Sequence, residues 1–466
     1  MKTFTKFSFL FFVLMLSWSK LFAQPGPIKN LRYNDDFSYL QSEAIVKKGT
    51  DKLKYIPLSH KNHYVSFGGE VREWYEYRKN SNFGDLPPGS VDNKNGILQH
   101  RLMLHADFQL GHRVRTFVQL NNTLEFGNQN APIPEIAVDG LGLHQAFVEY
   151  QFGKQKQQRK MSLRVGRQEY DFGNGLLISS REGPNNRLSF DGITLLTNTL
   201  SNNIHLLVAT PVIIETGIFD NKHIKEYVWG GYANLRQTKN NKLDAYYLGF
   251  YSERRQFNYV SGINRRHTVG MRAHNHGSKF YYDVETMLQA GKFNDLKVAA
   301  LNVTGEVRYI FQSAFWKPMI GIGASYITGD YDANDNQMNT FDPMYPKPVY
   351  GLAIPQGPTN ISHIRPTFGF QPTDKLFFNF RYYYLARTSI QDGTYTPGMV
   401  QVRPIPNITS DKRRLGNQFA LDVFYIINQH FTFLNFVSHV EAGPYPMETG
   451  VGKNVFYWAS ALQYKF

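Results

Sequence analysis

The sequence predicts an all-β fold, a transmembrane antiparallel up-and-down β-barrel of about 18 strands. Three observations predict it. Apolar and polar residues alternate from residue 63 onward, the connections between the alternating segments are short and long in turn, and the chain ends at Phe466 on an alternating aromatic segment. After the amino-terminal stretch, no apolar run is long enough for a membrane-spanning helix, so strands would have to cross the membrane.

Residues 1–23 have the pattern of a secretory signal peptide. Lys2 and Lys6 make a basic start, residues 7–16 are apolar, and a cleavage site follows Ala23. The stretch is too short for a spanning helix. We therefore expect the mature chain to be exported.

Residues 24–62 do not alternate. Pro25 and Pro27 interrupt this stretch, and polar residues dominate around residues 34–36. We interpret it as an N-terminal periplasmic lead-in or plug segment that lines or fills the barrel mouth. A flexible tail is the alternative.

Composition agrees with an exported barrel. The sequence contains no Cys, and Phe and Tyr are abundant, as in barrels with aromatic girdles. The formal net charge is +14, and removing the three lysines of residues 1–23 leaves +11. A basic surplus suits nucleic acid, anionic lipid or an anionic solute, and export makes nucleic acid an improbable partner.

The alternation has period two. In the first segment Val65, Phe67 and Val71 share one face, whereas Glu70 and Arg72 share the other. Successive strand side chains point to opposite faces, so each segment has an apolar, aromatic-rich face and a mixed face with charges of both signs. This pattern predicts that the apolar face contacts lipid and the charged face lines a water-filled lumen. Residues 63–466 are therefore assigned to the barrel.

The last segment has the features of a closing strand. Phe456, Trp458 and Tyr464 share one face, and Ala459 and Ala461 share the other. In a closed barrel the final strand pairs with the first, so that no strand edge is left in lipid. An edge strand of a soluble sandwich is the alternative for these residues taken alone.

The connections support a barrel with periplasmic turns and longer external loops. The short connections are 110–112, 199–203, 236–242, 275–279, 371–375 and 428–430. The long connections are 79–97, 122–142, 173–186, 211–226, 252–265, 328–362, 388–416 and 442–453. An even number of strands places both ends of the barrel chain in the periplasm.

Several segments carry a family resemblance. The most specific are residues 166–168 (Gly-Arg-Gln) and residues 190–192 (Phe-Asp-Gly). The matching segments are 163–177, 180–192, 266–270, 282–285, 328–330, 340–343 and 443–466. Together they resemble the alginate export family of outer-membrane porins, and the resemblance extends over nearly all of the mature chain.

In that family, a barrel of about eighteen strands with an arginine-rich constriction passes an anionic polysaccharide outward. The resemblance therefore implies a passive channel for anionic solutes in the bacterial outer membrane, without identifying alginate as the solute. A nutrient-uptake porin for small anions or oligosaccharides is one alternative. An outer-membrane enzyme is another, but no converging Ser, His and acid is legible in the sequence.

The candidate pore-lining residues are arginines, most of which fall on inward faces by parity. They are Arg72, Arg101, Arg115, Arg164, Arg167, Arg187, Arg266, Arg272, Arg308, Arg365 and Arg381. A guanidinium is always charged and can hold carboxylate, sulfate or phosphate oxygens with two donors. The arginines could instead pair with lumen acids as a structural network. These acids are Glu70, Asp107, Glu149, Asp191, Asp283, Glu285, Glu306 and Asp422.

Arg167 and Asp191 are charged residues that the period-two count does not place in the lumen. Counting by two from Val165 and Ile193 places both on the lipid face. Each sits beside a glycine, and glycine in a strand often marks a bulge. We predict bulges at Gly166 and Gly192 that turn both side chains into the lumen, where they pair. The alternative is that both lie at the rim, where no bulge is needed.

No metal or cofactor is predicted. Asp330 begins a sequence similar to a calcium loop, but the glycine is missing and Phe341 replaces the bidentate glutamate, so we expect a solvated external loop. We expect His274 and His276 to face solvent.

The expected partners are outer-membrane lipid, anionic polysaccharide or small anions, and the barrel-assembly machinery. We expect a monomer and no nucleic-acid partner.

Overall fold

The computed structural model describes residues 28–47, 49–60, 62–86, 90–130, 136–153, 160–199, 202–219, 224–236, 240–277, 279–403 and 409–466. The predicted signal peptide and residues 24–27 lie outside the described residues. No helix in the described part of the chain is long and apolar enough to cross a membrane.

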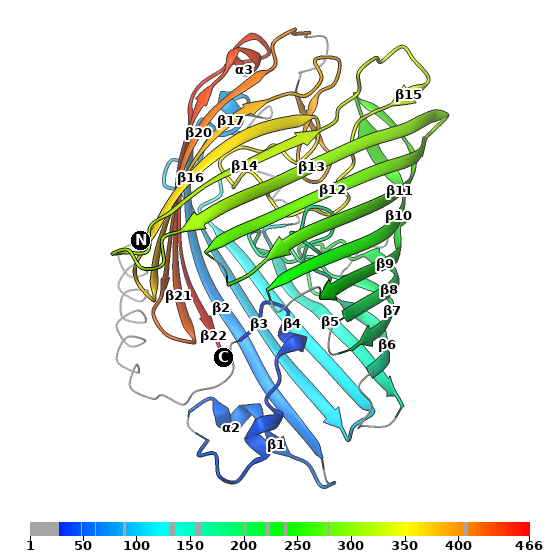
Figure 1. Ribbon diagram of the computed structural model, residues 1–466, viewed down its shortest axis with the longest axis vertical. Coiled ribbons are helices and arrows are strands. Elements are labelled where there is room, and N and C mark those ends of the chain that lie inside the picture. Colours follow the sequence, from blue (N-terminus) through cyan, green and yellow to red (C-terminus); the bar gives the residue numbers. More distant parts are fainter. Residues whose placement is uncertain are drawn as a thin grey trace.

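Eighteen long antiparallel strands of the described chain form a closed barrel, as the alternation predicts (Figure 1). The first nine are β2 (His63–Lys79), β3 (Ile97–Leu110), β4 (Val114–Phe126), β5 (Asp139–Phe152), β6 (Lys160–Gln168), β7 (Phe190–Asn198), β8 (Asn202–Pro211), β9 (Glu226–Arg236) and β10 (Asn241–Phe257). The others are β11 (Val260–Asn275), β12 (Phe280–Phe293), β13 (Leu296–Ile310), β14 (Met319–Ile327), β16 (Ile361–Thr373), β17 (Leu376–Ala386), β20 (Arg414–Ile426), β21 (Phe431–Ala442) and β22 (Val455–Lys465).

Short elements occupy both ends of the barrel. At the end with the short turns lie η1 (Arg32–Asn34), η2 (Ser38–Gln41), α2 (Asp51–Lys54) and β1 (Ile56–Pro57), and β1 pairs with the start of β2. At the loop end lie η3 (Ser81–Gly84), β15 (Gln337–Met338), β18 (Thr394–Tyr395), β19 (Gln401–Arg403) and α3 (Pro444–Glu448). In outer-membrane barrels the short turns face the periplasm.

Closure occurs between the first and last barrel strands. β22 pairs with β2 from Glu70–Lys465 to Lys79–Phe456. Backbone hydrogen bonds then join Gly69 and Phe466 in both directions, at 2.9 and 3.0 Å. The predicted closing strand is confirmed, and the alternative of a sandwich edge is excluded.

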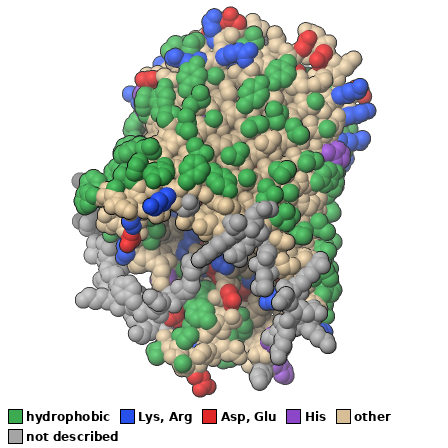
Figure 2. All heavy atoms as spheres, viewed as in Figure 1, with side chains coloured by type: hydrophobic (Ala, Val, Ile, Leu, Met, Phe, Trp, Pro, Cys, Tyr) green, Lys and Arg blue, Asp and Glu red, His purple; other side chains and the backbone are tan. Residues whose placement is uncertain are grey.

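The two faces of the wall differ as predicted. On β22, Phe456 and Trp458 are 37% and 39% exposed on the outer face, whereas Ala459 and Ala461 are buried. Figure 2 shows hydrophobic side chains spread over the outer wall, with charged side chains mainly near the ends and in the hollow at the lower end. An apolar wall of this kind suits contact with lipid.

Two predictions about the connections are wrong. Residues 252–265 are not a long loop, because β10 and β11 extend to Phe257 and from Val260 and are joined by two residues. Long connection 173–186 and residues 338–362 of the next long connection do not extend into solvent either, whereas residues 331–337 are exposed. Both fold back into the barrel, where Ile178 and Tyr345 form a parallel bridge. Apolar side chains drive this, since Leu176, Ile178 and Phe341 are buried together in the main core cluster.

Candidate functional site

The N-terminal segment enters the periplasmic mouth of the barrel. The Tyr33 ring packs edge-on against Phe117 and Phe147, with centroids 6.3 and 5.7 Å away, and the Arg164 guanidinium lies 4.3 Å from its centroid. The Tyr33 hydroxyl donates to Glu169 O at 2.8 Å. Burial raises the pKa of Tyr33 to about 12, so it remains a neutral donor. Residues around Tyr33 thus touch both the wall and the inward-folded loop.

The same segment is fastened at the closure seam. Arg32 Nη1 donates to Gly69 O at 2.8 Å and Nη2 donates to Phe466 O at 2.6 Å, so one guanidinium spans the first and last strands. Lys54 Nζ, from α2, donates to Phe67 O at 2.8 Å. These contacts hold η1 and α2 against the barrel.

The docking of this segment should depend on pH through Lys54. Burial, and then the neighbouring charge of Arg32, lower the pKa of Lys54 to about 7, while Asp35 and Asp51 act in the opposite direction. The undocked lysine keeps its proton up to its ordinary pKa of 10.5, whereas the docked lysine loses it near pH 7. Docking is therefore weakest below pH 7 and strengthens as pH rises between these two values.

A single spin label at Ser42→Cys would measure this docking, because the natural chain has no cysteine. We expect the label to be more mobile at pH 6 than at pH 9, and Lys54→Met to abolish the difference. If the label on the otherwise natural chain is equally mobile at both pH values, docking does not depend on pH through Lys54.

Loop 169–189, between β6 and β7, is pinned to the wall by arginines from β2 and β3. Arg72 donates to the backbone oxygens of Glu182 and Pro184, at 2.7 and 3.1 Å. Arg101 lies 2.8 Å from the Glu182 carboxylate and 2.5 Å from that of Glu70. Desolvation alone would raise the pKa of Glu182. The positive charges of Arg187 and Arg101 outweigh it and hold that pKa well below its usual range. Glu182 therefore stays ionised as the anchor of the loop tip.

Loop 328–360, between β14 and β16, is held in the same way from the opposite wall. Arg266 Nη1 donates to Thr340 O at 2.5 Å. Arg255 of β10 is also buried and lies 3.0 Å from Asp342. Asp330 and Asp342 are both buried, but residues 331–337 between them are exposed, so the expected solvated loop is present over that stretch. Within the described ranges, no three His, Asp or Glu side chains are grouped so that they could hold a metal ion.

Most of the remaining predicted arginines face the lumen and form ion pairs with predicted acids. The pairs are Arg115–Asp107 at 2.7 Å, Arg164–Glu149 at 2.7 Å, Arg272–Asp283 at 2.6 Å, Arg308–Glu306 at 2.7 Å, Arg381–Asp422 at 2.5 Å and Arg365–Glu306. Glu285 instead accepts from the Tyr246 hydroxyl at 2.7 Å. The residues are brought together along the inner wall as a paired network rather than as a ring of free cations.

The predicted pair Arg167–Asp191 forms, with two contacts of 2.8 Å, but not in the lumen. No register shift occurs at Gly166 or Gly192, so the prediction of bulges is wrong. Gly166 is required instead for its φ of +127° and because a Cβ would lie 2.3 Å from Ala146 O. The neighbours Val165 and Ile193 are 46% and 52% exposed on the same outer face. The pair therefore sits outside the lumen, beside the ends of β6 and β7.

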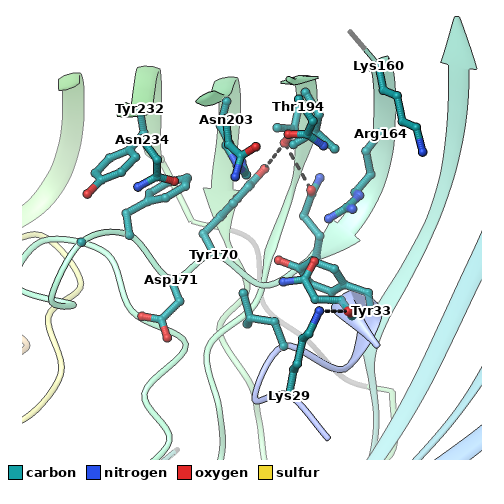
Figure 3. Close-up of a pocket in the computed structure, with 18 of the residues that line it drawn as sticks. Lys29, Tyr33, Lys160, Arg164, Tyr170, Asp171, Thr194, Asn203, Tyr232 and Asn234 are labelled. Atoms are coloured by element: carbon teal, nitrogen blue, oxygen red, sulfur yellow. Dashed lines mark hydrogen bonds between the residues drawn. The ribbon is translucent and has the colours of Figure 1, made fainter. Parts of the chain in front are cut away.

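A periplasmic cavity of about 990 Å³ lies between the N-terminal segment and the wall from β4 to β11. Figure 3 shows Lys29 and Tyr33 from the segment, Lys160 and Arg164 from β6, and Asp171 from the folded loop around this space. Its basic lining side chains are Lys29, Arg115, Lys160, Arg164, Lys242 and Arg272, against the carboxylates Glu149 and Asp171. The three lysines are exposed and have no ion-pair partner among the described residues.

Sequence reasoning missed these lysines and misplaced a histidine. Lys160 shares the parity of Ser162 and Arg164, so continuing the count to the strand end would have found it. No such signal exists for Lys29, which precedes the alternating region. His274, expected to face solvent, is buried and lines the periplasmic cavity.

A second space, the inner cavity, has a volume of about 670 Å³ and lies beneath the two folded loops. Its lining includes Arg308, Arg365 and Arg381, and it shares Asp171 and Gly173 with the periplasmic cavity. Five Lys and Arg side chains line it against six acids. The surplus of positive charge therefore lies at the periplasmic cavity and not here.

Comparisons with known proteins agree with this geometry. Residues 63–450 match the family model described as Alginate export. Among solved structures, the chain is similar to Pseudomonas aeruginosa OccK11 (OpdR), at 10% identity and a TM-score of 0.55, covering 86% of this chain and 96% of that chain. It is also similar to Acinetobacter baumannii OccAB1, at 13% identity and a TM-score of 0.56, covering 86% and 96%.

A third similar structure is a BenF-like porin from Pseudomonas fluorescens Pf-5, at 7% identity and a TM-score of 0.56, covering 86% of this chain and 98% of that chain. A search of curated proteins finds no match. The structural likenesses concern the fold, which is that of an outer-membrane porin barrel.

Proposed function

Since the chain belongs to the alginate export family and forms a channel in the bacterial outer membrane, we propose that it passes anionic solutes passively, selected at the periplasmic cavity. One observation carries the proposal. Six basic side chains line that cavity against two carboxylates. A basic lining between low-dielectric walls raises the local concentration of anions.

The size of the solute is a second question. Loops 169–189 and 328–360 meet inside the barrel, where Tyr345 N donates to Leu177 O at 2.8 Å. A narrowed lumen favours small anions or short oligosaccharides, as in an uptake porin. Passage of an anionic polymer, which the family description favours, would require these loops to separate.

Replacing Lys29, Lys160 and Lys242 together with Gln should lower the anion preference of the pore. The lysines supply the charge that no carboxylate in the described chain neutralises, and their effect should weaken at high salt because screening grows. Reversal potentials in a KCl gradient across a planar bilayer would measure the preference before and after the change.

A matched control is the triple change Lys317→Gln, Lys375→Gln and Lys412→Gln. These lysines lie on turns and loops and line neither cavity. The control removes the same charge and should leave the reversal potential unchanged. A natural pore that prefers potassium, or equal shifts from both triples, would overturn the proposal.

We further propose that the barrel acts as a monomer inserted by the barrel-assembly machinery. Closure within one chain supports this, because β22 completes the sheet on β2 without a second subunit. The closing residue Phe466 provides the means to test it.

A further inference from the structure

The inner cavity has one wall of unusual chemistry. Leu434 and Phe436 on β21, and Phe424 on β20, occupy inward positions that are polar in most porin strands. All three are half-buried and line the cavity. With Trp74 of β2 they form a continuous apolar patch facing the lumen.

Packing of the patch explains its shape. The Trp74 and Phe436 rings stack with centroids 5.5 Å apart, and Phe424 meets Phe436 edge-on at 5.8 Å. The intervening strand β22 presents Ala459 and Ala461, which are the cross-strand partners of Phe436 and Trp74. The small alanines leave room for the Trp74 and Phe436 rings to stack across β22, and the Phe424 ring stands at 86° to that of Phe436.

A row of arginines (Arg308, Arg365 and Arg381) adjoins this patch. Asp422 accepts from Arg381 at 2.5 Å and is the cross-strand partner of Phe436, so the patch and the row touch. Arg365 reaches over Gly323 to Glu306, and a Cβ on that glycine would lie 2.8 Å from Arg365 Nη2. Three guanidinium groups therefore face two carboxylates.

The arginine row keeps the capacity to bind. The side chains of Arg308, Arg365 and Arg381 are 27%, 15% and 19% exposed. Their Nε–H groups are buried, so a solute would meet the Nη groups. Arg308 and Arg365 each donate to Glu306 through Nη2, and within the described chain no hydrogen bond uses their Nη1 groups. A guanidinium with spare donors holds a carboxylate with two hydrogen bonds.

Resting on the proposed anion channel, we propose that the inner cavity binds organic acids in which a carboxylate is attached to an apolar ring. The carboxylate lies on the arginine row and the ring lies on the apolar patch. The side chains of Val349 and Leu352, from the folded loop 328–360, also line this cavity and extend its apolar surface. Acids without a ring, or with a ring covered in hydroxyls, lack one of the two contacts.

The probe is cyclohexanecarboxylate added to KCl during single-channel recording. We expect a concentration-dependent block of the current, with much weaker block by acetate, which has no ring, and by glucuronate, whose ring is polar. Phe436→Ser should weaken the block about tenfold, as expected for the loss of one ring contact. Leu434→Ser is a second variant with the same expected direction.

Two controls protect this test. Phe436→Tyr keeps the ring and should keep the block, and Leu235→Ser changes an apolar side chain of the periplasmic cavity and should leave it intact. Equal block by glucuronate, or no block while the pore remains anion-selective, would overturn this inference alone. A cation-selective pore would instead overturn the proposed function.

Discussion

Replacing Phe466 with Asp, or deleting it, is expected to remove most of the folded barrel from the outer membrane while leaving export to the periplasm intact. Phe466 completes the seam through two backbone hydrogen bonds to Gly69 and accepts a third from Arg32. Its ring also stacks on Tyr464, with centroids 5.7 Å apart. Deletion removes all of these contacts, a loss on the order of 3 kcal/mol.

Heat-modifiable migration of the barrel in membrane fractions would measure this effect. Phe466→Tyr keeps the ring and the backbone contacts and serves as the matched control, with normal levels expected. Wild-type levels of folded barrel after the deletion would contradict the role of the seam. Loss of the chain from the periplasm as well would point to a defect in export instead.

Replacing Arg72 and Arg101 together with Met should release loop 169–189 and raise the single-channel conductance severalfold. These arginines hold the Glu182 carboxylate and the backbone oxygens around it. Their loss removes the donors to the backbone oxygens of Glu182 and Pro184 and one of the two arginine partners of the Glu182 carboxylate, whose side chain is 35% exposed. The loop tip is then held to the wall by fewer contacts and can move out of the lumen.

The double change Arg308→Met and Arg381→Met is the matched control. It also removes two inward charges, but neither side chain has a hydrogen bond to loop 169–189 within the described chain. Because both arginines line the inner cavity, we expect a change in anion preference, but not the severalfold rise in conductance that release of the loop gives. Equal increases from both double variants would show that charge, and not loop anchoring, limits the current.

The pKa of Glu182 gives this anchor a pH dependence with a definite sign. The pKa of the Glu182 carboxyl is lower when the loop is docked than when it is free. The ionised carboxylate therefore stabilises the docked loop fully above the ordinary pKa of 4.5, and this stabilisation is lost as pH falls through the lowered pKa. The conductance of the natural pore should therefore stay constant at neutral and mildly acidic pH and rise only in strong acid.

The sequence by itself determined the wall of this protein. Period-two alternation assigns a face to every strand residue without knowledge of its neighbours, so Arg72, Arg115 and Arg381 could be placed inward and Trp458 outward. The closing role of the last strand also followed, since a barrel in lipid cannot leave an edge unpaired.

The tertiary structure alone decided what the inward arginines do. Their partners come from loops with no periodicity, and contacts such as Arg72 with Glu182 and Arg266 with Thr340 join positions far apart in the chain. The prediction of a long connection over residues 252–265 was wrong because polar residues can continue a strand beyond the membrane. Lys29 joined the site only because Arg32 and Tyr33 anchor its segment inside the mouth. Such contacts form between surfaces that come together only when the barrel closes. The local sequence pattern therefore cannot predict them.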